Sequence, residues 1–377
     1  MSPTRRLRVG VIGLGEIAQI MHLPYLRELE ERYEIAAICD ISPQLVARIG
    51  DLYGVDHRYT DFRALVAQPD LDAVFVLTPY HFQPALAALQ QGKHVLVEKP
   101  MCTNLREADT LIETAARNGC ILMVAYMKRY DPGYLYGQRK IQEIPDIRLV
   151  ELHDIIGPNA LFIREAHRVY RFDDPPRDLI AQQQAEYQAA ITEAIGLVPP
   201  HVRQAYSLML GLSVHDVTIL CGAVGRPRRV LTTHIWDDGR FFSSLLDYGD
   251  FLCTFTTGRT EMRRFDEVLR VYGRQRVVTI SFPSPYIRNM PTLVHVEEMA
   301  DGAFTDCRVE ASYEEAFKRE LIHFHECVTE NRRPLTSGEE GRADIALLIQ
   351  MIEAYKRGAG AGLNPAALAP TTPPGAR

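Results

Sequence analysis

Cysteine is scarce in this chain of 377 residues. The seven cysteines are scattered, their number is odd, and they form no C-x-x-C pair. This pattern argues against a disulfide framework and is typical of reduced thiols in a cytoplasmic protein. The His, Cys, Asp and Glu residues show no metal-ligand spacing either, so we expect no metal site.

Excess positive charge and long apolar runs are also lacking. The net charge of −6 and the pI near 6.1 give no electrostatic reason to expect nucleic acid or an anionic membrane as a partner. No apolar run approaches the length of a membrane span. Residues 1–6 lack the apolar segment of a signal peptide. We therefore expect a cytoplasmic protein with neither kind of partner.

The chain does have enough apolar material for a large core. It is 46% apolar and 24% charged, and it is too long for one ordinary domain. We expect a first domain over residues 1–128 and a second over 129–357. The stretch 358–377 is rich in Ala, Pro and Gly, which predicts a disordered tail.

A glycine-rich turn after the first apolar run is the most informative local feature. Residues 9–18 read Val-Gly-Val-Ile-Gly-Leu-Gly-Glu-Ile-Ala, the G-x-G-x-x-A form of the dinucleotide-binding motif. Gly13 permits a tight turn, Gly15 lets the backbone approach a pyrophosphate, and Ala18 lets the helix pack on the strand. A second strand ends at Asp40, where a carboxylate can accept hydrogen bonds from a ribose. We therefore expect NAD(H) in preference to NADP(H), because this carboxylate repels a 2′-phosphate and residues 41–43 supply no arginine.

Strands and helices alternate up to residue 126, which predicts a doubly wound parallel sheet of the Rossmann type. Ligands in such sheets bind beyond the carboxyl ends of the strands. The second half has consecutive strands separated by glycine turns, which predicts an α+β domain with a large, mostly antiparallel sheet. A helix over 205–220 precedes these strands. The segment 157–204 is a long excursion that we expect to shape substrate choice or to act as a solvated arm or oligomer clasp.

Several motifs occur in a characteristic order. They are the glycine motif, Thr78-Pro79, Glu98-Lys99-Pro100, residues 126–132 (Tyr-Met-Lys-Arg-Tyr-Asp-Pro) and a helix bearing His215. In this combination the chain resembles the Gfo/Idh/MocA family of nicotinamide-dependent oxidoreductases. The resemblance implies a Rossmann domain, a second domain whose open sheet forms the oligomer interface, and sugar, cyclitol or polyol substrates. It predicts a homodimer or homotetramer.

The resemblance also implies which residues act. Lys99 and His215 are the expected catalytic pair, because both can exchange a proton with a hydroxyl near neutral pH when the lysine pKa is lowered. Relatives carry an acid four residues before the histidine, and this chain has Gly211 there. The usual lysine–aspartate–histidine relay is therefore incomplete. A structural role for His215 stays open.

The remaining site residues are expected around this pair. The cofactor-binding set is Gly13, Gly15, Glu16, Ile17, Asp40, Ile41, Thr78, Pro79, His81, Glu98, Lys99 and Tyr126. The substrate-binding set is Arg129, His153 and Asp216, with Arg129 alternatively an ion-pair residue at the domain junction. On the strand over 147–156, His153 and Asp154 face opposite sides, so either one can reach the cleft.

The sequence thus predicts an NAD(H)-dependent oxidoreductase that transfers a hydride to or from a hydroxyl or keto carbon of a sugar, cyclitol or glycoside. Two alternatives remain. One is an enzyme that oxidises its substrate transiently, around an elimination or hydrolysis. The other is a non-catalytic sensor of a sugar or dinucleotide.

Overall fold

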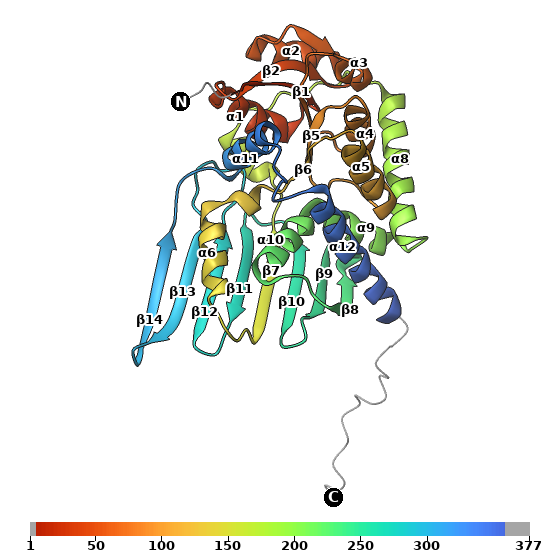
Figure 1. Cartoon of the computed structure of the whole chain (residues 1–377). Coiled ribbons are helices and arrows are strands. Elements are labelled where there is room, and N and C mark those ends of the chain that lie inside the picture. Colours follow the sequence, from red (N-terminus) through yellow and green to blue (C-terminus); the bar gives the residue numbers. More distant parts are fainter. Residues whose placement is uncertain (1–4, 359–377) are drawn as a thin grey trace, which may run out of the picture.

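The computed structural model describes residues 5–358 and contains two sheets, one above the other in Figure 1. Of the predicted tail, Gly358 ends the last helix and the rest lies outside the described residues. The predicted fold class is confirmed: a parallel sheet of the Rossmann type is followed by a larger, mostly antiparallel sheet.

The first sheet has six parallel strands in the order β3-β2-β1-β4-β5-β6. The strands are β1 (Leu7–Ile12), β2 (Tyr33–Cys39), β3 (His57–Tyr59), β4 (Ala73–Val76), β5 (His94–Glu98) and β6 (Leu122–Ala125). The helices between them are α1 (Leu23–Glu28), α2 (Pro43–Tyr53), α3 (Phe62–Val66), α4 (Phe82–Gln90) and α5 (Leu105–Arg117). The strand order reverses between β1 and β4, which is where such sheets bind ligands.

The second sheet has eight strands in the order β14-β13-β12-β11-β7-β10-β9-β8, and only the pair β7–β10 is parallel among the described strands. The strands are β7 (Leu149–Ile156), β8 (Arg229–Trp236), β9 (Phe241–Asp247), β10 (Leu252–Arg259), β11 (Phe265–Tyr272), β12 (Arg276–Phe282), β13 (Leu293–Ala300) and β14 (Ala303–Glu310). The later helices are α6 (Pro132–Gln142), α7 (Ala160–Ala166), α8 (Arg177–Ile195), α9 (Pro200–Leu208), α10 (Val214–Val224), α11 (Ala316–Glu330) and α12 (Gly338–Gly358).

Helices α6, α10 and α12 pack against one face of the second sheet (Figure 1). Strand residues alternate between the two faces, so Val230 and Phe255 are buried on the helix-covered face, with Ile235 packed beside them. Leu245 and Leu252 occupy the alternate positions and point to the other face. Helices of the same chain therefore cover Val230, Phe255 and Ile235, whereas Leu245 and Leu252 lie on the face that these helices leave open.

Helices α9 and α10 form one continuous helix, joined by a π-helical turn, η3 (Met209–Ser213). The helix begins at Pro200, earlier than predicted, because proline fits the first turn of a helix. It passes through Gly222, where a Cβ would lie 2.4 Å from the Tyr134 hydroxyl, so this glycine permits close packing and does not end the helix. The helix is long and apolar enough to span a membrane, with a mean hydropathy of 1.6, but 72% of that window is buried inside the protein. It is a core helix that carries His215.

Candidate active site

The glycine turn after β1 forms a cradle suited to a dinucleotide. Gly13 has φ +93°, and a Cβ there would lie 2.7 Å from the carbonyl carbon and oxygen of Leu77, so only glycine fits. At Gly15 a Cβ would meet no atom of the described residues within 4 Å, so open space lies above the loop. Ala18 is fully buried where the following helix begins. These features fit a pyrophosphate held against the start of that helix.

Asp40 connects the end of β2 to the glycine turn. Its carboxylate accepts hydrogen bonds from the main-chain N–H of Leu14 at 2.8 Å and of Ser42 at 3.0 Å. Burial raises the pKa of Asp40, with Asp174 adding to the effect and the two hydrogen bonds opposing it. A carboxylate has about four acceptor sites, so Asp40 retains capacity for the hydroxyls of a ribose.

The ends of β4 and β5 are tied together by hydrogen bonds. Thr78 donates its hydroxyl to the Tyr80 carbonyl at 2.8 Å. His81 pairs through Nδ1 with the Pro100 carbonyl at 2.7 Å, and burial lowers the pKa of His81 to about 4. His81 is therefore neutral near pH 7 and donates this bond.

Glu98 is buried and anchors the loop that carries Lys99. Its carboxylate lies 2.9 Å from Nε2 of His22 and accepts the Lys99 main-chain N–H at 3.0 Å. Burial acts to raise the pKa of Glu98, but the hydrogen bond and charge of His22 outweigh it, and the pKa is lowered. Glu98 is thus an ionised residue that fixes the position of Lys99.

Lys99 links the two halves of the chain. Its Nζ donates a hydrogen bond of 2.7 Å to the main-chain carbonyl of Gly211, in the turn η3 just before His215. Burial lowers the pKa of Lys99, Glu98 opposes this, and the positive charges of Lys128 and Arg259 lower it further. Lys99 therefore releases its proton more readily than an ordinary lysine.

His215 lies on α10 and is 8% exposed. Its Nδ1 has no hydrogen-bond partner among residues 5–358. Burial, followed by the charges of Lys99 and Lys128, holds the pKa of His215 well below its usual value. The imidazole is consequently neutral, so one of its nitrogens can accept a hydrogen bond and the other can donate one.

Three carboxylates meet beside this pair. One oxygen from each of Asp154, Asp216 and Glu267 lies within 4.8 Å of the other two, and all three residues are buried. We call these three residues the carboxylate cluster. Lys128, also buried, forms an ion pair with Glu267. The cluster thus combines three acids with one directly paired ammonium group.

The charges of the cluster decide its protonation. Burial acts to lower the pKa of Lys128, but Glu267, Asp154 and Asp216 outweigh it, and the pKa is raised. Burial, followed by the charge of Glu267, raises the pKa of Asp154 well above the usual range. Burial, followed by the charges of Asp154 and Glu267, does the same to the pKa of Asp216. Both carboxyl groups therefore hold a proton to higher pH than an ordinary aspartate does, while Lys128 stays charged.

Of the three predicted substrate-binding residues, Asp216 and Arg129 are buried beside α10 or on it, and they have different partners. Asp216 belongs to the carboxylate cluster. Arg129 is buried and donates from one guanidinium nitrogen to the Thr218 carbonyl and hydroxyl, at 3.2 and 3.4 Å. It holds α10 against the turn after β6 and forms no ion pair with any of residues 5–358, so the alternative of an ion pair at the domain junction is not seen there.

The prediction that His153 reaches the cleft is wrong. It lies on the sheet face opposite Asp154 and pairs with Asp266 at 3.2 Å, because successive side chains of β7 alternate. Tyr126, predicted in the cofactor site, is fully buried and packs in the core. Burial, followed by the charge of Asp344 on α12, raises the pKa of its phenol. Its side chain therefore faces α12.

Sequence reasoning missed Lys128 and Glu267. Lys128 lies inside the recognised motif, but adjacent arginine and lysine residues gave no sign of which one enters the site. Glu267 reaches the site because it pairs directly across from Asp154 in the β11–β7 register, a contact between strands more than 100 residues apart. An acid in a strand that is otherwise apolar on its buried face was the available signal.

Together these groups can move a proton. Lys99, with its lowered pKa, follows the carboxyl end of β5 and is hydrogen-bonded to the turn that precedes the neutral His215. Asp154 and Asp216, whose pKa values are raised, belong to the carboxylate cluster nearby. Such an arrangement suits the removal of a hydroxyl proton or its return to a carbonyl oxygen.

Comparison with known proteins agrees with this geometry. The family model for oxidoreductases with an NAD-binding Rossmann fold, Gfo/Idh/MocA, matches residues 7–126. A myo-inositol 2-dehydrogenase of Thermotoga maritima is 32% identical over 361 residues, which cover 91% of this chain and 94% of that protein. A scyllo-inositol 2-dehydrogenase (NADP(+)) of Bacillus subtilis is 32% identical over 139 residues, which cover 36% and 38%.

The fold is also shared with solved structures. An aldose-aldose oxidoreductase from Caulobacter crescentus superimposes with a TM-score of 0.71 at 19% identity, over 94% of this chain and 98% of that one. Its likeness extends through both sheets. With the inositol dehydrogenase similarity over nearly the whole length, the chain belongs to the Gfo/Idh/MocA family of NAD(P)-binding oxidoreductases.

Proposed function

We propose that this protein is an NAD(H)-dependent dehydrogenase or reductase acting on a CH–OH carbon of a sugar, cyclitol or glycoside. The substrate class is supported by the inositol dehydrogenase relative and by the aldose-aldose oxidoreductase of like fold. The observation that carries the proposal is the bond from Lys99 to the Gly211 carbonyl, which brings a lysine of lowered pKa to the His215 helix.

In this proposal Lys99 and His215 divide the proton chemistry. A bound nicotinamide supplies the hydride acceptor or donor. During oxidation the Lys99 amine accepts the hydroxyl proton, because its lowered pKa leaves more of the neutral amine than an ordinary lysine has. The neutral His215 holds the reacting oxygen by a hydrogen bond, since two nearby lysines oppose its protonation. Reduction reverses these transfers.

NAD(H) is the proposed cofactor because of Asp40. Its carboxylate stands after β2, where it favours ribose hydroxyls and repels a 2′-phosphate. The Bacillus subtilis relative is named for NADP(+), so the preference is a property to be tested on this chain.

A second candidate function follows from Gly211, which leaves the expected acid position without a carboxylate. In that alternative the enzyme oxidises its substrate transiently and reduces it again after an elimination or hydrolysis. The two functions differ in their cofactor balance, because only the dehydrogenase releases NADH.

We also propose a cytoplasmic homodimer or homotetramer joined through the open face of the second sheet, with no nucleic-acid or membrane partner. Leu245 and Leu252 lie on this face, and Trp236 stacks on Phe241 there with ring centroids 5.7 Å apart. A second copy would remove this apolar surface from water.

The test is a substrate screen with NAD and with NADP. Purified protein is incubated with inositols, aldoses and glycosides, and NADH formation is followed at 340 nm alongside product analysis. Net NADH formation with a polyol supports the dehydrogenase. Product formation without net NADH supports transient oxidation. Nucleotide binding without turnover of any substrate class would contradict both enzymatic readings.

A further inference from the structure

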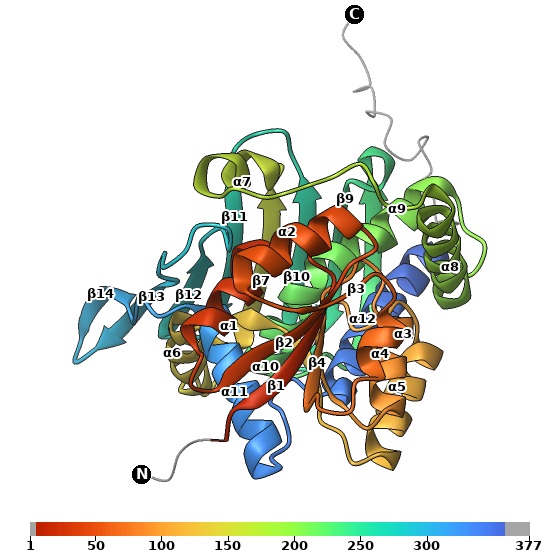
Figure 2. The same cartoon turned by 90° about the horizontal axis from the view of Figure 1, so that it is seen from above.

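The segment between α7 and α8, residues 167–176, crosses from the second half of the chain onto the first sheet's domain, where it runs near α2 (Figure 2). We call it the strap. Its side chains Val169, Tyr170 and Phe172 pack against the apolar core beside β1 and β2. The segment 157–204, which includes the strap, is expected from the sequence to shape substrate choice. His167 pairs with the Tyr286 carbonyl of the second half, but Tyr170, Arg171 and Asp174 all bond to the cofactor half of the molecule.

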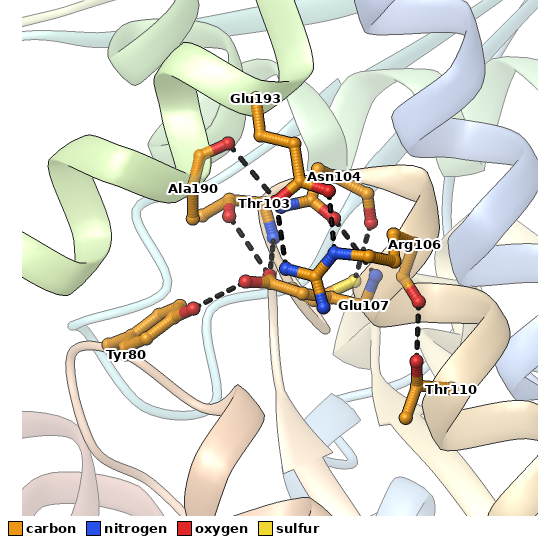
Figure 3. A network of polar contacts seen from close by, with 9 residues as sticks. Tyr80, Thr103, Asn104, Arg106, Glu107, Thr110, Ala190 and Glu193 are labelled. Carbon is orange, nitrogen blue, oxygen red and sulfur yellow. Dashed lines mark hydrogen bonds and ion pairs between the residues drawn. The ribbon is translucent and has the colours of Figure 1, made fainter.

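Helix α8 anchors the far end of the strap. Figure 3 shows the polar network that holds it to α5. Arg106 donates two hydrogen bonds to the Glu193 carboxylate, at 2.6 and 2.8 Å, and Asn104 reaches the Ala190 carbonyl at 3.4 Å. The strap is thus part of a segment with a fixed attachment to the first domain at α8.

The first half of the strap lies on the helix that follows the glycine turn. Gln19 accepts a hydrogen bond from the Tyr170 main-chain N–H at 2.8 Å and donates to the Tyr170 carbonyl at 3.0 Å. The same Gln19 amide donates to the carbonyl of Leu14 in the glycine turn. Arg171 forms an ion pair with Glu16. These contacts fix the strap beside the expected pyrophosphate site.

The second half of the strap ends at the N-terminus of α2. Asp174 accepts a hydrogen bond from the Ser42 hydroxyl at 2.5 Å and another from the Gln44 main-chain N–H at 2.8 Å. Ser42, only 2% exposed, accepts the Leu45 N–H at 3.0 Å. The free donors that start α2 are therefore used, and a negative charge already occupies the place that the helix dipole favours for an anion.

This place is the one that distinguishes the two nicotinamide cofactors. The ribose of a bound dinucleotide lies by the acid that ends β2, here Asp40, and a 2′-phosphate would extend toward the residues that follow it. Asp40 accepts the Ser42 N–H while Asp174 accepts the Ser42 hydroxyl. Two carboxylates from distant parts of the chain therefore flank one serine.

We propose that Asp174 is a specificity-determining residue, which excludes NADP(H) by holding with its own carboxylate the anion position that a ribose 2′-phosphate requires. The inference rests on the proposed NAD(H) preference and adds to it a residue from the second half of the chain. Its carboxylate both repels the phosphate and occupies the Ser42 and Gln44 donors that would bind it.

Two arginine side chains at the strap favour phosphate binding once Asp174 is removed. Arg48 on α2 stacks on the Tyr170 ring at 4.5 Å and donates to its hydroxyl at 2.7 Å, and Arg168 lies 5.0 Å from the same ring. Gln44 and Arg48 are four residues apart on α2 and therefore share one face of the helix. Loss of Asp174 would free the Ser42 and Gln44 donors in a region that already carries the two guanidinium groups around Tyr170. A variant without the Asp174 carboxylate would then combine arginine side chains with unoccupied hydrogen-bond donors, the groups that bind phosphate in proteins.

The test is calorimetric titration of the whole protein with NADH and with NADPH, without substrate. We expect Asp174→Ala to tighten NADPH binding about tenfold or more, the scale of a hydrogen bond to a charged group, with a much smaller change for NADH. Asp173→Ala is the matched control, because it removes an exposed carboxylate from the adjacent strap position. Asp174→Asn keeps the side-chain size and removes only the charge, so it should also tighten NADPH binding.

Three results would overturn the proposal: unchanged NADPH affinity in both Asp174 variants, an equal gain in Asp173→Ala, or equal weakening of both nucleotides. Each of these results would reject the role of Asp174. If the wild type still bound NADH more tightly than NADPH, the proposal that NAD(H) is the cofactor would stand. A wild type that binds NADPH more tightly, or neither nucleotide, would instead contradict the proposed function itself.

Discussion

At the scale of single residues, the bond between Lys99 and Gly211 shows how this chain departs from the family pattern. The resemblance predicts a carboxylate at position 211, but here Nζ of Lys99 meets a main-chain carbonyl instead. A carbonyl accepts the hydrogen bond without a full negative charge, so it stabilises the protonated lysine less than an acid would. Burial is the main cause of the lowered pKa of Lys99, and position 211 supplies no carboxylate to oppose it.

We expect Lys99→Ala to lower turnover by about 10²–10⁴-fold, the usual scale for losing a general acid or base, with a smaller change in NADH affinity. Steady-state kinetics and nucleotide titration on the same preparation separate the two effects. Lys140→Ala, a surface lysine paired with Glu143, is the control. His215→Ala should resemble Lys99→Ala, and near wild-type turnover in either variant would remove that residue from the mechanism.

Position 211 can be tested by restoring the acid. Gly211 is exposed, and a Cβ there meets no atom of the described residues within 4 Å, so a side chain can start from this position without a clash at its Cβ. A carboxylate close to Lys99 favours its charged form and raises its pKa. We expect the alkaline rise of kcat/KM for oxidation to move to higher pH. Gly211→Asn is the uncharged control, and identical pH profiles for the two variants would exclude this electrostatic account.

At the scale of the element, β7 illustrates what alternation predicts and what it leaves open. The sequence correctly separates His153 and Asp154 onto opposite faces, but it cannot tell which face the helices cover. That depends on α10, which packs on the side of Asp154. The prediction of His153 was therefore wrong because of where α10 packs, which the sequence of β7 alone does not contain.

The two residues provide a paired prediction. Asp154→Asn alters the carboxylate cluster beside Lys99 and His215, so we expect it to lower kcat by at least about tenfold and to change the pH profile. His153 lies on the open face, so His153→Ala should leave kcat within about twofold of the wild-type value. Kinetics over pH 6–9 would show the difference. If His153→Ala lowered kcat more than Asp154→Asn does, the cleft would lie on the open face of the sheet, contrary to this assignment.

Other elements were missed because their sequence signals are ambiguous. Helix α6 starts with Pro132-Gly133, a pair typical of turns, yet Asp131 caps the helix by accepting the Tyr134 N–H. Strand β14 is exposed along almost its whole length, so it has no buried alternation to detect. Parallel strands β1 and β4, in contrast, are almost wholly buried, and their continuous apolar runs predicted them correctly.

At the scale of the whole molecule, local motifs predicted the first domain and the position of Lys99, while the rest of the site depends on tertiary pairing. Glu267 and Asp174 are each brought to their partners from more than 100 residues away. Neither belongs to a motif with its partner. Such contacts require the packing of the two sheets and the course of the strap, which local sequence patterns do not contain.

The carboxylate cluster makes stability depend on pH. Asp216 has a raised pKa in the folded state, so folding favours its protonated form; this contribution is full at low pH and is lost as pH rises from about 4 toward the folded pKa. Asp216→Asn does not titrate. The free energy of unfolding of the variant relative to wild type should therefore increase with pH, by at most about 1.4 kcal/mol per pH unit.

Urea unfolding between pH 5 and pH 8, at one protein concentration, measures this difference. Asp173→Asn, on the exposed strap, is the control for loss of a carboxylate without burial. Coupling between Asp216 and Asp154 distributes the titration over both residues and widens the pH range of the effect. A difference that stays constant or falls as pH rises would show that Asp216 is not protonated on folding.

The open face of the second sheet leads to the last prediction. Leu252 is 40% exposed and Trp236 is 46% exposed on the face that α6, α10 and α12 leave uncovered. Next to them in the strands, Cys253 is fully buried and Ile235 partly buried on the other side. If two copies cover this face, light scattering at micromolar concentration should give at least twice the mass of the chain. Leu252→Arg should then yield monomers, because a buried unpaired guanidinium is costly. Leu197→Arg adds the same charge at a leucine that is 90% exposed in the loop before α9, and it should keep the assembly. A monomeric wild type, or equal dissociation of both variants, would show that the open face is not the interface.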